Sequence, residues 1–204
     1  MAHDRRLGAR YVAGADEAGR GCLAGPLVTA AVCLDVERLD RRRLADLDDS
    51  KRLRPEQREE LYTAVIDNAL QVVVIAVSSE EIDRRGLHRC NLDGLARALE
   101  ALDQPEPEIC LADGFALPRC RRAARRLVGG DGLSAAVAAA SVIAKVTRDR
   151  FMQAQAAHYP EYGFDRHLGY ITPEHSALVR QLGVTPLHRR SFNARAYAEL
   201  GLGT

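Results

Sequence analysis

The sequence predicts an α/β fold in which helices cover a central sheet of short strands. Apolar runs of strand length alternate with longer helical segments up to about residue 158. From residue 159 onward there is no clear strand pattern, which predicts a helical lobe. We therefore expect a core over residues 1–158 and a C-terminal helical segment over residues 159–204 that packs on the same domain.

Each expected strand is an apolar run bounded by turn residues. The run V-T-A-A-V-C-L follows the turn at Gly25-Pro26, and the β-branched run that ends at Val77 predicts a buried strand. The last expected strand is short and lies at an edge of the sheet. The strands are expected over residues 11–16, 28–34, 71–77, 108–112 and 126–128.

The expected helices carry start and stop signals. Pro55 suits the first position of a helix over residues 55–70, and Ser134 can cap a long helix from residue 135 to about 158. The first half of that helix is dense in alanine, which allows a close approach to the sheet. Further helices are expected over residues 87–102 and after the cap at Thr172, before Gly183.

The charge of the chain excludes a uniformly basic protein. The formal net charge of the 204 residues is +1, so any nucleic-acid binding must come from local patches. Arginines cluster at residues 41–43, 119–126 and 189–190. Each cluster alone is most simply a solvated surface, whereas three together are compatible with a phosphate-binding face.

The cysteines and the hydropathy of the chain indicate in which cellular compartment the protein is expected. The five cysteines are odd in number and form no C-x-x-C pair, which argues against a disulfide framework and a zinc ribbon. The first ten residues are charged, which does not fit a signal peptide, and no apolar run is long enough for a membrane helix. We expect a reducing cytoplasm, no membrane association and a monomer.

Acidic residues stand where expected strands end or helices begin. Asp16 and Glu17 follow an apolar strand inside G-A-D-E-A-G-R-G, Asp113 ends a second strand, and Asp131 precedes the long helix. Converging carboxylates repel one another unless cations neutralise them, and hard oxygen ligands suit Mg²⁺ or Mn²⁺. Two such ions can activate water for cleavage of a phosphodiester.

Two questions about these acids stay open at this stage. Asp113 or Asp131 alone would be most simply a turn or capping residue. Adjacent strand residues point to opposite faces, so Asp16 and Glu17 reach one site only if the strand ends there, or if Glu17 contributes its backbone carbonyl.

The turn at Gly19-Arg20-Gly21 suggests close contact with a ligand. Glycines let backbone N–H groups approach a ligand, and a 2′-hydroxyl is the group that distinguishes RNA from DNA. Arg20 could hold an adjacent phosphate. The simpler alternative is a tight turn with a surface arginine.

These motifs together resemble ribonuclease HII, a type 2 ribonuclease H. The similarity runs through L-A-G-P, D-S-K at residues 49–51, H-R-C-N-L, A-D-G and A-A-A-S-V-I-A-K-V-T-R-D-R. It continues with Y-G-F, G-Y-I-T-P-E-H and H-R-R-S-F, so that nearly the whole chain is covered.

The resemblance implies a ribonuclease H-like fold, with a mixed central sheet, flanking helices and a C-terminal helical lobe. It implies four catalytic acids and a ribonucleotide-sensing turn. Three of the acids, Asp16, Glu17 and Asp113, would bind Mn²⁺ or Mg²⁺. Tyr170 would pack on the sugar at an RNA–DNA junction. The implied catalytic residues are Asp16, Glu17, Asp113 and Asp131, and the implied substrate-binding residues are Gly19, Arg20, Gly21, Lys51, Lys145 and Tyr170.

Other residues of the matched segments are expected to be structural. Ser141 is expected to pack on or bond to the active-site strands, and His188 to pack or lie at the surface. Leu168 and Ile171 depart from the Lys and Gly that the family often has there, and Arg166 could replace a missing phosphate contact.

The implied activity is endonucleolytic cleavage of the RNA strand of RNA/DNA hybrids and of the phosphodiester 5′ to ribonucleotides embedded in duplex DNA. The products would carry a 3′-hydroxyl and a 5′-phosphate. The alternatives are a catalytically inactive hybrid-binding protein, a junction resolvase on the same fold and a metal-dependent phosphatase.

Overall fold

The computed structural model describes residues 2–40, 42–49, 54–198 and 200–201. The chain forms two compact units. The first unit comprises Met1–Ala18, Val28–Ile75 and Leu92–Val146. The second unit comprises Gly19–Leu27, Ala76–Asn91 and Thr147–Thr204. Each unit has hydrophobic clusters of its own.

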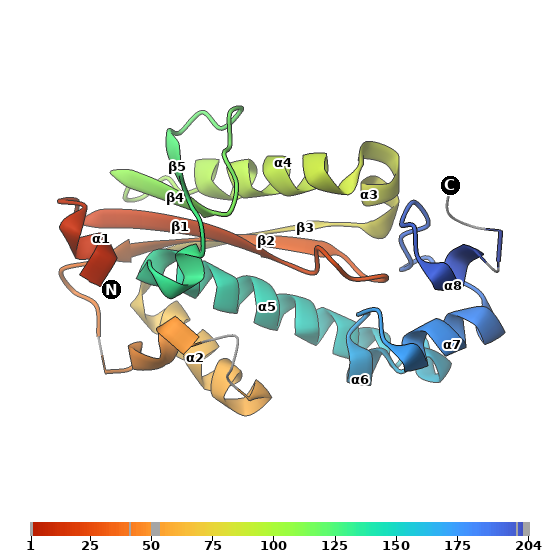
Figure 1. Cartoon of the computed structure of the whole chain (residues 1–204). Helices are drawn as coiled ribbons and strands as arrows, with labels where there is room; N and C mark the ends of the chain where they lie inside the picture. Colours follow the sequence, from red (N-terminus) through yellow and green to blue (C-terminus); the bar gives the residue numbers. More distant parts are fainter. Residues whose placement is uncertain (1, 41, 50–53, 199, 202–204) are drawn as a thin grey trace. The chain divides into compact units, whose positions relative to one another are not determined.

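The first unit is built on a mixed sheet of five strands in the order β3-β2-β1-β4-β5 (Figure 1). β1 pairs antiparallel with β2 and parallel with β4, which in turn pairs parallel with β5. The mixed sheet confirms the predicted fold class. The strands are β1 (Tyr11–Ala18), β2 (Leu27–Asp35), β3 (Ala69–Val77), β4 (Ile109–Asp113) and β5 (Ala124–Leu127).

Alternate strand residues face different helices. Val12 of β1 and Leu111 of β4 belong to the cluster that contains α2 (Pro55–Asn68) and the first half of α5 (Ala135–Gln155). Ala13 and Cys110 belong to the cluster that contains α4 (Leu87–Glu100). Figure 1 shows α4 on one side of the sheet and α2 and α5 on the other.

The start of α5 lies unusually close to β1, as its alanines predict. All residues of the stretch Ala135–Ala140 have no exposed surface. A Cβ atom on Gly14 would lie 2.2 Å from the backbone carbon of Ala136, so only glycine fits at this point of the strand. Ser134 accepts the N–H of Val137 at 3.3 Å, which confirms the predicted cap.

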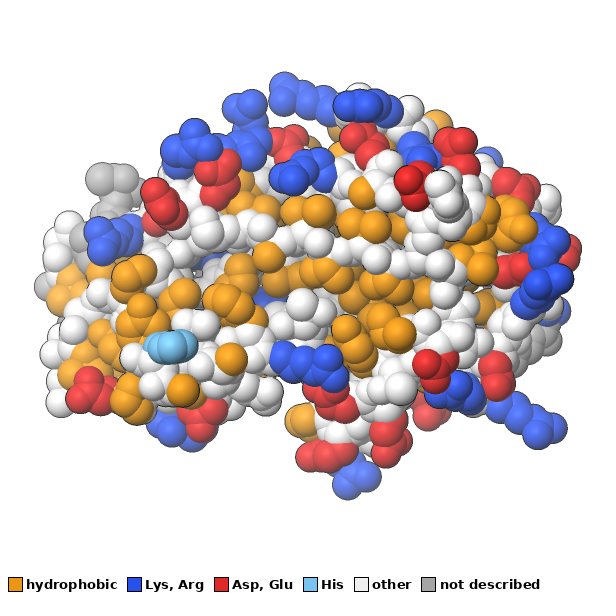
Figure 2. All heavy atoms as spheres, turned by 180° about the vertical axis from the view of Figure 1, so that it is seen from behind, with side chains coloured by type: hydrophobic (Ala, Val, Ile, Leu, Met, Phe, Trp, Pro, Cys, Tyr) orange, Lys and Arg blue, Asp and Glu red, His pale blue; other side chains and the backbone are white. Residues whose placement is uncertain are grey.

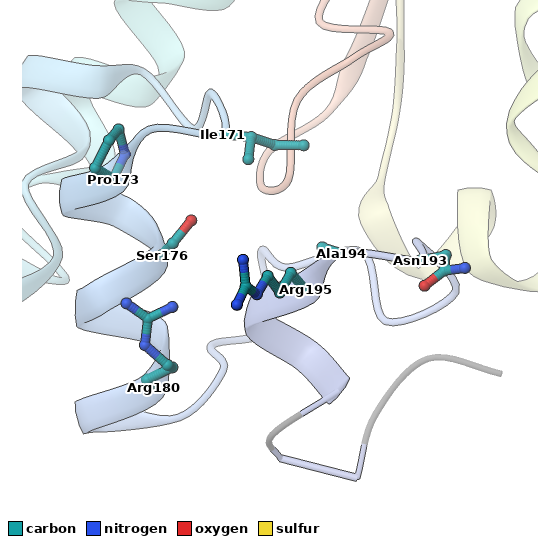
Figure 3. Close-up of a pocket in the computed structure, with 7 residues that line it drawn as sticks. All are labelled: Ile171, Pro173, Ser176, Arg180, Asn193, Ala194 and Arg195. Carbon is teal, nitrogen blue, oxygen red and sulfur yellow. The ribbon is translucent and has the colours of Figure 1, made fainter.

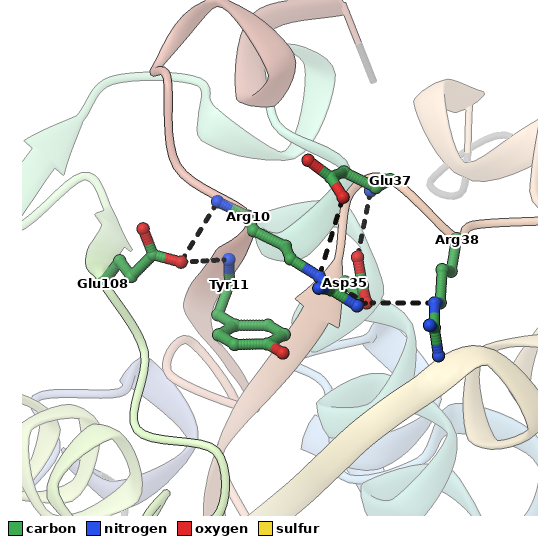
Figure 4. A network of polar contacts seen from close by, with 6 residues as sticks. All are labelled: Arg10, Tyr11, Asp35, Glu37, Arg38 and Glu108. Atoms are coloured by element: carbon green, nitrogen blue, oxygen red, sulfur yellow. Dashed lines mark hydrogen bonds and ion pairs between the residues drawn. The ribbon is translucent and has the colours of Figure 1, made fainter.

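A polar network fixes the ends of three strands of this unit (Figure 4). Arg10 donates to the Asp35 carboxylate at 2.8 Å, and Glu108 accepts the backbone N–H groups of Arg10 and Tyr11 at 3.2 and 3.1 Å. The Arg10 guanidinium lowers the pKa of Asp35 below its usual value. The beginnings of β1 and β4 and the end of β2 are thus held together.

The second unit is helical after α5. It contains α3 (Ser79–Arg85), α6 (Phe164–His167), α7 (Pro173–Leu182) and α8 (Arg195–Ala198). Among the described residues no strand follows β5, which agrees with the predicted helical lobe. Thr172 caps α7 by accepting the N–H of His175 at 3.0 Å, and Gly183 ends the helix with a φ of 82°.

Short helical segments complete the chain. They are α1 (Ala2–Arg6) and the 3-10 turns η1 (Ala45–Asp49), η2 (Gly130–Gly132) and η3 (Pro160–Tyr162). Asp4 of α1 is fully buried and accepts the N–H of Ala136, the second residue of α5, at 3.2 Å. In the described part of the chain, no helix combines the length and hydropathy needed to cross a membrane.

Several predicted boundaries were wrong. β1 continues two residues past Asp16, because pairing with β2 extends to Ala18. α5 ends at Gln155 rather than near residue 158, β5 covers Ala124–Leu127 rather than residues 126–128, and α3 was not predicted. The 71–77 run is not a buried strand either, since β3 forms an edge of the sheet and is partly exposed.

The exposed part of β3 gives the first unit a hydrophobic surface. Leu70 and Val74 of β3 and Ile66 of α2 keep more than a third of their surface exposed. Figure 2 shows a band of hydrophobic side chains on the face of the molecule that is turned away from the viewer in Figure 1.

Candidate active site

Asp16 and Asp113 point to the same face of the sheet. Ala15 pairs with Ala112 in the parallel register of β1 and β4, so these two acids are the next residues along their strands. Along β1, Asp16 points to the same face as Val12, and along β4, Asp113 points to the same face as Leu111. Val12 and Leu111 pack against α5. The carboxylates therefore leave neighbouring strands on the α5 side.

Ser141 of α5 completes this arrangement. Its side chain forms a hydrogen bond with Asp16, as the sequence predicted. Lys145 lies four residues further along α5, on the same helical face as Ser141. A hydroxyl and an ammonium group thus lie on the helix face that carries the contact with Asp16.

The environment of Asp16 disfavours its negative charge. The side chain is only 5 % exposed. Burial, followed by the nearby charges of Glu17 and Asp113, raises the pKa of Asp16 to about 8, although the hydrogen bonds from Glu17 and Ser141 oppose the rise. A carboxylate crowded in this way is a common feature of catalytic and metal-binding sites.

Glu17 stands differently from Asp16. Because β1 continues through Ala18, the Glu17 side chain leaves the sheet on the opposite face. Its backbone N–H donates to Asp16 Oδ1 at 2.7 Å. The condition that the strand ends at Asp16 is therefore not met, which favours a role for the Glu17 backbone carbonyl.

The loop before α5 lies next to the end of β4. The N–H of Gly130 donates to Asp113 Oδ1 at 2.7 Å. Asp131 follows in η2 and accepts the N–H of Gly132 at 3.1 Å. The backbone around Asp131 is thus tied to Asp113, although the sequence separates the two acids by 18 positions.

In the second unit, the segment Gly19–Leu27 contains the predicted sensing turn. Gly19 has a φ of 87°, and a Cβ atom there would lie 2.0 Å from Arg148 Nε. A Cβ atom on Gly21 would meet nothing within 4 Å. Gly19 is therefore required by the fold of the turn, whereas Gly21 leaves open space beside the backbone.

Two buried arginines hold this segment. Arg148 donates to the carbonyl oxygens of Ala24 and Pro26 at 2.8 and 3.1 Å. Arg189 donates to those of Gly25 and Arg20 at 2.9 and 3.0 Å. Neither arginine has any exposed surface.

A groove lies between α7 and α8 of the second unit, with a volume of about 620 Å³ (Figure 3). Ser176 and Arg180 project into it from one face of α7, and Arg195 projects from α8. Its described lining residues include no Asp or Glu. The charge of this groove suits an anion such as a phosphate group.

Comparison with known proteins identifies the family. The family model described as Ribonuclease HII matches residues 13–195. The chain belongs to the ribonuclease HII family.

Individual relatives agree with the family model. The chain is 50 % identical over 195 residues to a ribonuclease HII of Geobacillus kaustophilus, covering 94 % of this chain and 73 % of the relative. It resembles the ribonuclease H2 structure from Pyrococcus horikoshii with a TM-score of 0.78 and 30 % identity, over 94 % and 98 % of the two chains. A ribonuclease HII of Archaeoglobus fulgidus, solved in complex with PCNA, matches with a TM-score of 0.77 and 28 % identity over 90 % and 96 %.

Membership in the ribonuclease HII family confirms the expected ribonuclease H-like fold and makes the protein an endoribonuclease. The donor chemistry fits the divalent ions on which this class of enzyme depends, because the acids around Asp16 offer only oxygen ligands. Within the described residues, no three His, Cys, Asp or Glu side chains are gathered closely enough to hold a metal ion. The ligand set of the ribonuclease HII site therefore stays a prediction.

Of the remaining predicted substrate residues, those that the structure describes lie in the second unit. Lys51 lies outside the described residues. Tyr170 is 39 % exposed in the second unit. Arg166, considered as a replacement phosphate contact, donates to Glu174 at 3.0 Å and is engaged there.

The sequence interpretation missed the buried cations of the second unit. The arginine cluster at residues 189–190 was expected at the surface, which is wrong for Arg189, because its guanidinium satisfies backbone carbonyls inside the unit. Arg148 was not singled out as a contact of the turn. Only the position of Arg148 on an alanine-rich helix, next to buried neighbours, could have hinted at this role.

Proposed function

We propose that the protein hydrolyses the phosphodiester 5′ to ribonucleotides embedded in duplex DNA and cuts the RNA strand of RNA/DNA hybrids. The products carry a 3′-hydroxyl and a 5′-phosphate. The observation that carries this proposal is the pair Asp16 and Asp113 on one face of the sheet, where burial and then the charges of Glu17 and Asp113 raise the pKa of Asp16. Family membership supports the same reaction class.

Asp16, Glu17 and Asp113 are the proposed holders of Mg²⁺ or Mn²⁺, and Asp131 is the fourth catalytic acid. When bound, such ions would supply Lewis-acid activation of a water molecule and positive charge beside the departing 3′-oxygen. Ser141 orients the Asp16 carboxylate through its hydrogen bond. Lys145, which follows Ser141 by one helical turn on the same face of α5, is the proposed contact for a phosphate of the substrate strand.

The second unit supplies the proposed sugar recognition. The backbone of Gly19-Arg20-Gly21 contacts the 2′-hydroxyl, and the open space beside Gly21 admits a ribose. Tyr170 packs on the deoxyribose at the junction with DNA. The groove with Arg180 and Arg195 binds a backbone phosphate of the duplex.

The setting of this activity is also proposed. None of the five cysteines, all of which lie in the described part of the chain, forms a disulfide bond, which fits a reducing compartment. We propose the cytoplasm as the location and a monomer as the active form.

A DNA duplex with one embedded ribonucleotide tests the reaction. Incubation with Mg²⁺ or Mn²⁺ is expected to give a single cut 5′ to the ribonucleotide, which is absent with chelator and on an all-DNA duplex. The Asp16→Asn variant is expected to bind the duplex without cutting it. Folded wild-type protein that binds hybrids but cuts neither this duplex nor a long hybrid would instead indicate a hybrid-binding protein without catalysis.

A further inference from the structure

Arg148 binds three separate backbone carbonyls of the second unit. Its Nε donates to Pro26 at 3.1 Å, its Nη1 to Leu168 at 2.9 Å and its Nη2 to Ala24 at 2.8 Å. The side chain has no exposed surface. A buried charge is retained only where its donors are satisfied, and here each of the three guanidinium nitrogens has an acceptor.

The same guanidinium lies against Tyr170. Its central carbon is 5.7 Å from the centre of the tyrosine ring, within the range of a cation–π contact. Tyr170 follows Leu168 and Gly169, which have φ values of 50° and 79°. The backbone that carries the ring is therefore in an unusual conformation, and Arg148 binds it at Leu168.

The two segments that meet at Arg148 are also bonded to each other. The Gly169 carbonyl accepts the N–H groups of Leu23 and Ala24 at 2.8 and 3.2 Å. On the other side, Gly19 has no room for a Cβ atom because Arg148 occupies that space. The Arg148 side chain thus contacts the sensing turn, the segment Ala24–Pro26 that follows it, and the loop that carries Tyr170.

We propose that Arg148 is a positioning residue that fixes the Tyr170 ring relative to the Gly19-Arg20-Gly21 turn and thereby sets the preference for an RNA–DNA junction. This inference rests on the proposed function, in which the turn contacts a ribose and Tyr170 packs on the deoxyribose beside it. Arg148 itself touches neither sugar. A displacement of about 1 Å between two recognition elements is enough to reduce turnover strongly.

Lysine is the informative replacement at this position. An ammonium group keeps the positive charge but cannot direct donors to three carbonyls and lie flat against a ring at the same time. Arg148→Lys is therefore expected to keep the unit folded while loosening Tyr170 from the turn.

The decisive measurement is the ratio of kcat/KM on a duplex with one embedded ribonucleotide to kcat/KM on a long RNA/DNA hybrid. Only the first substrate offers a deoxyribose for Tyr170 next to the ribonucleotide. In Arg148→Lys this ratio is expected to fall about tenfold or more, because junction cleavage is lost selectively. A general loss of folded protein lowers both values equally and leaves the ratio unchanged.

Tyr162→Phe provides the matched control. Tyr162 lies in the same unit and its hydroxyl donates to the carbonyls of Leu182 and Gly183 at 3.2 and 3.1 Å, so its loss weakens the end of α7 without removing a contact of Arg148 or of Arg189. Its ratio is expected to equal that of the wild type. Gly169→Ala serves as the second variant, because a Cβ atom there would lie 2.3 Å from the Ala24 carbonyl oxygen and separate the same segments.

An unchanged ratio in folded Arg148→Lys overturns the proposal. If that variant does not fold, an unchanged ratio in Gly169→Ala overturns it. An equal fall of the ratio in the control Tyr162→Phe overturns it as well. Failure of the proposed function is distinguishable, because then the wild-type protein itself does not cut at the single ribonucleotide.

Discussion

His175 and His188 face each other in the second unit with their Nε2 atoms 3.1 Å apart. His188 Nδ1 accepts the N–H of Thr185 at 2.9 Å, so His188 donates through Nε2. His175 Nε2 accepts this hydrogen bond, and His175 Nδ1 donates to the carbonyl oxygen of Tyr170 at 2.8 Å. This assignment of donors and acceptors requires both rings to be neutral.

The neutral pair predicts acid sensitivity of the fold. Burial lowers the pKa of His175 to about 4 and that of His188 to about 3. Below pH 6.5 the unfolded histidines take up protons while the folded ones do not, so stability falls as the pH is lowered toward 4. The slope approaches about 1.4 kcal/mol per pH unit for each histidine, measured as the free energy of unfolding in urea between pH 7.5 and 5.

Two variants assign this slope. His175→Asn is expected to reduce the slope by about 1.4 kcal/mol per pH unit, which is the contribution of one proton. His158→Gln replaces an exposed histidine and is expected to leave the slope unchanged. Equal slopes in wild type and His175→Asn would show that the pair is not neutral in the folded protein.

The contact between β1 and α5 predicts a severe effect of one methyl group. In Gly14→Ala the new Cβ atom would lie 2.2 Å from the backbone nitrogen of Val137. Because this contact is with backbone, no side-chain rotation can relieve it. We expect a loss of about 3 kcal/mol or insoluble protein. Gly132→Ala is the control, because no atom lies within 4 Å of its Cβ position. A Gly14→Ala protein with the wild-type Tm would show that α5 lies further from β1.

The strands and helices were largely predictable because their signals are local. Ser134, Thr172 and Gly183 mark helix ends by their own side chains or backbone conformation, and each prediction was confirmed. The exposure of β3 was not predictable, because an apolar run does not reveal whether a sixth strand will cover it. The two residues by which β1 exceeds its prediction depend on pairing with β2, a contact distant in sequence.

The acids were found by their position after apolar strands, but their geometry was not. The alternation of side chains along β1 and β4 in the structure shows that Asp16 and Asp113 lie on one face of the sheet and Glu17 on the other. Arg189 illustrates a further limit, since a cationic side chain in a polar run is expected in solvent. Its burial depends on the Gly25 and Arg20 carbonyls, which lie more than 160 residues away in the sequence.

The groove between α7 and α8 predicts a specific salt dependence of duplex binding. Replacing both Arg180 and Arg195 by alanine is expected to weaken binding and to reduce the slope of log Kd against log salt concentration by about 1 to 2, with kcat unchanged. The control for net charge is the double variant Arg84→Ala/Arg85→Ala, which removes two cations paired with Glu81 on α3 of the same unit. A groove variant whose salt slope equals that of this control would exclude the groove from the binding surface.

The crowding around Asp16 predicts that the active site lowers the stability of the metal-free protein. A neutral amide at a position that is only 5 % exposed avoids the cost of burying a carboxylate and the repulsion from Glu17 and Asp113. Asp16→Asn is therefore expected to unfold at a higher temperature than wild type in chelator. The gain is on the order of 1 kcal/mol, or roughly 2–4 °C in Tm. Mn²⁺ at 100 times its Kd should then stabilise the wild type by about 2.7 kcal/mol and the variant by clearly less. A variant that is less stable in chelator, or that gains as much from Mn²⁺ as the wild type, would mean that Asp16 is a structural carboxylate and that the metal is held by other residues.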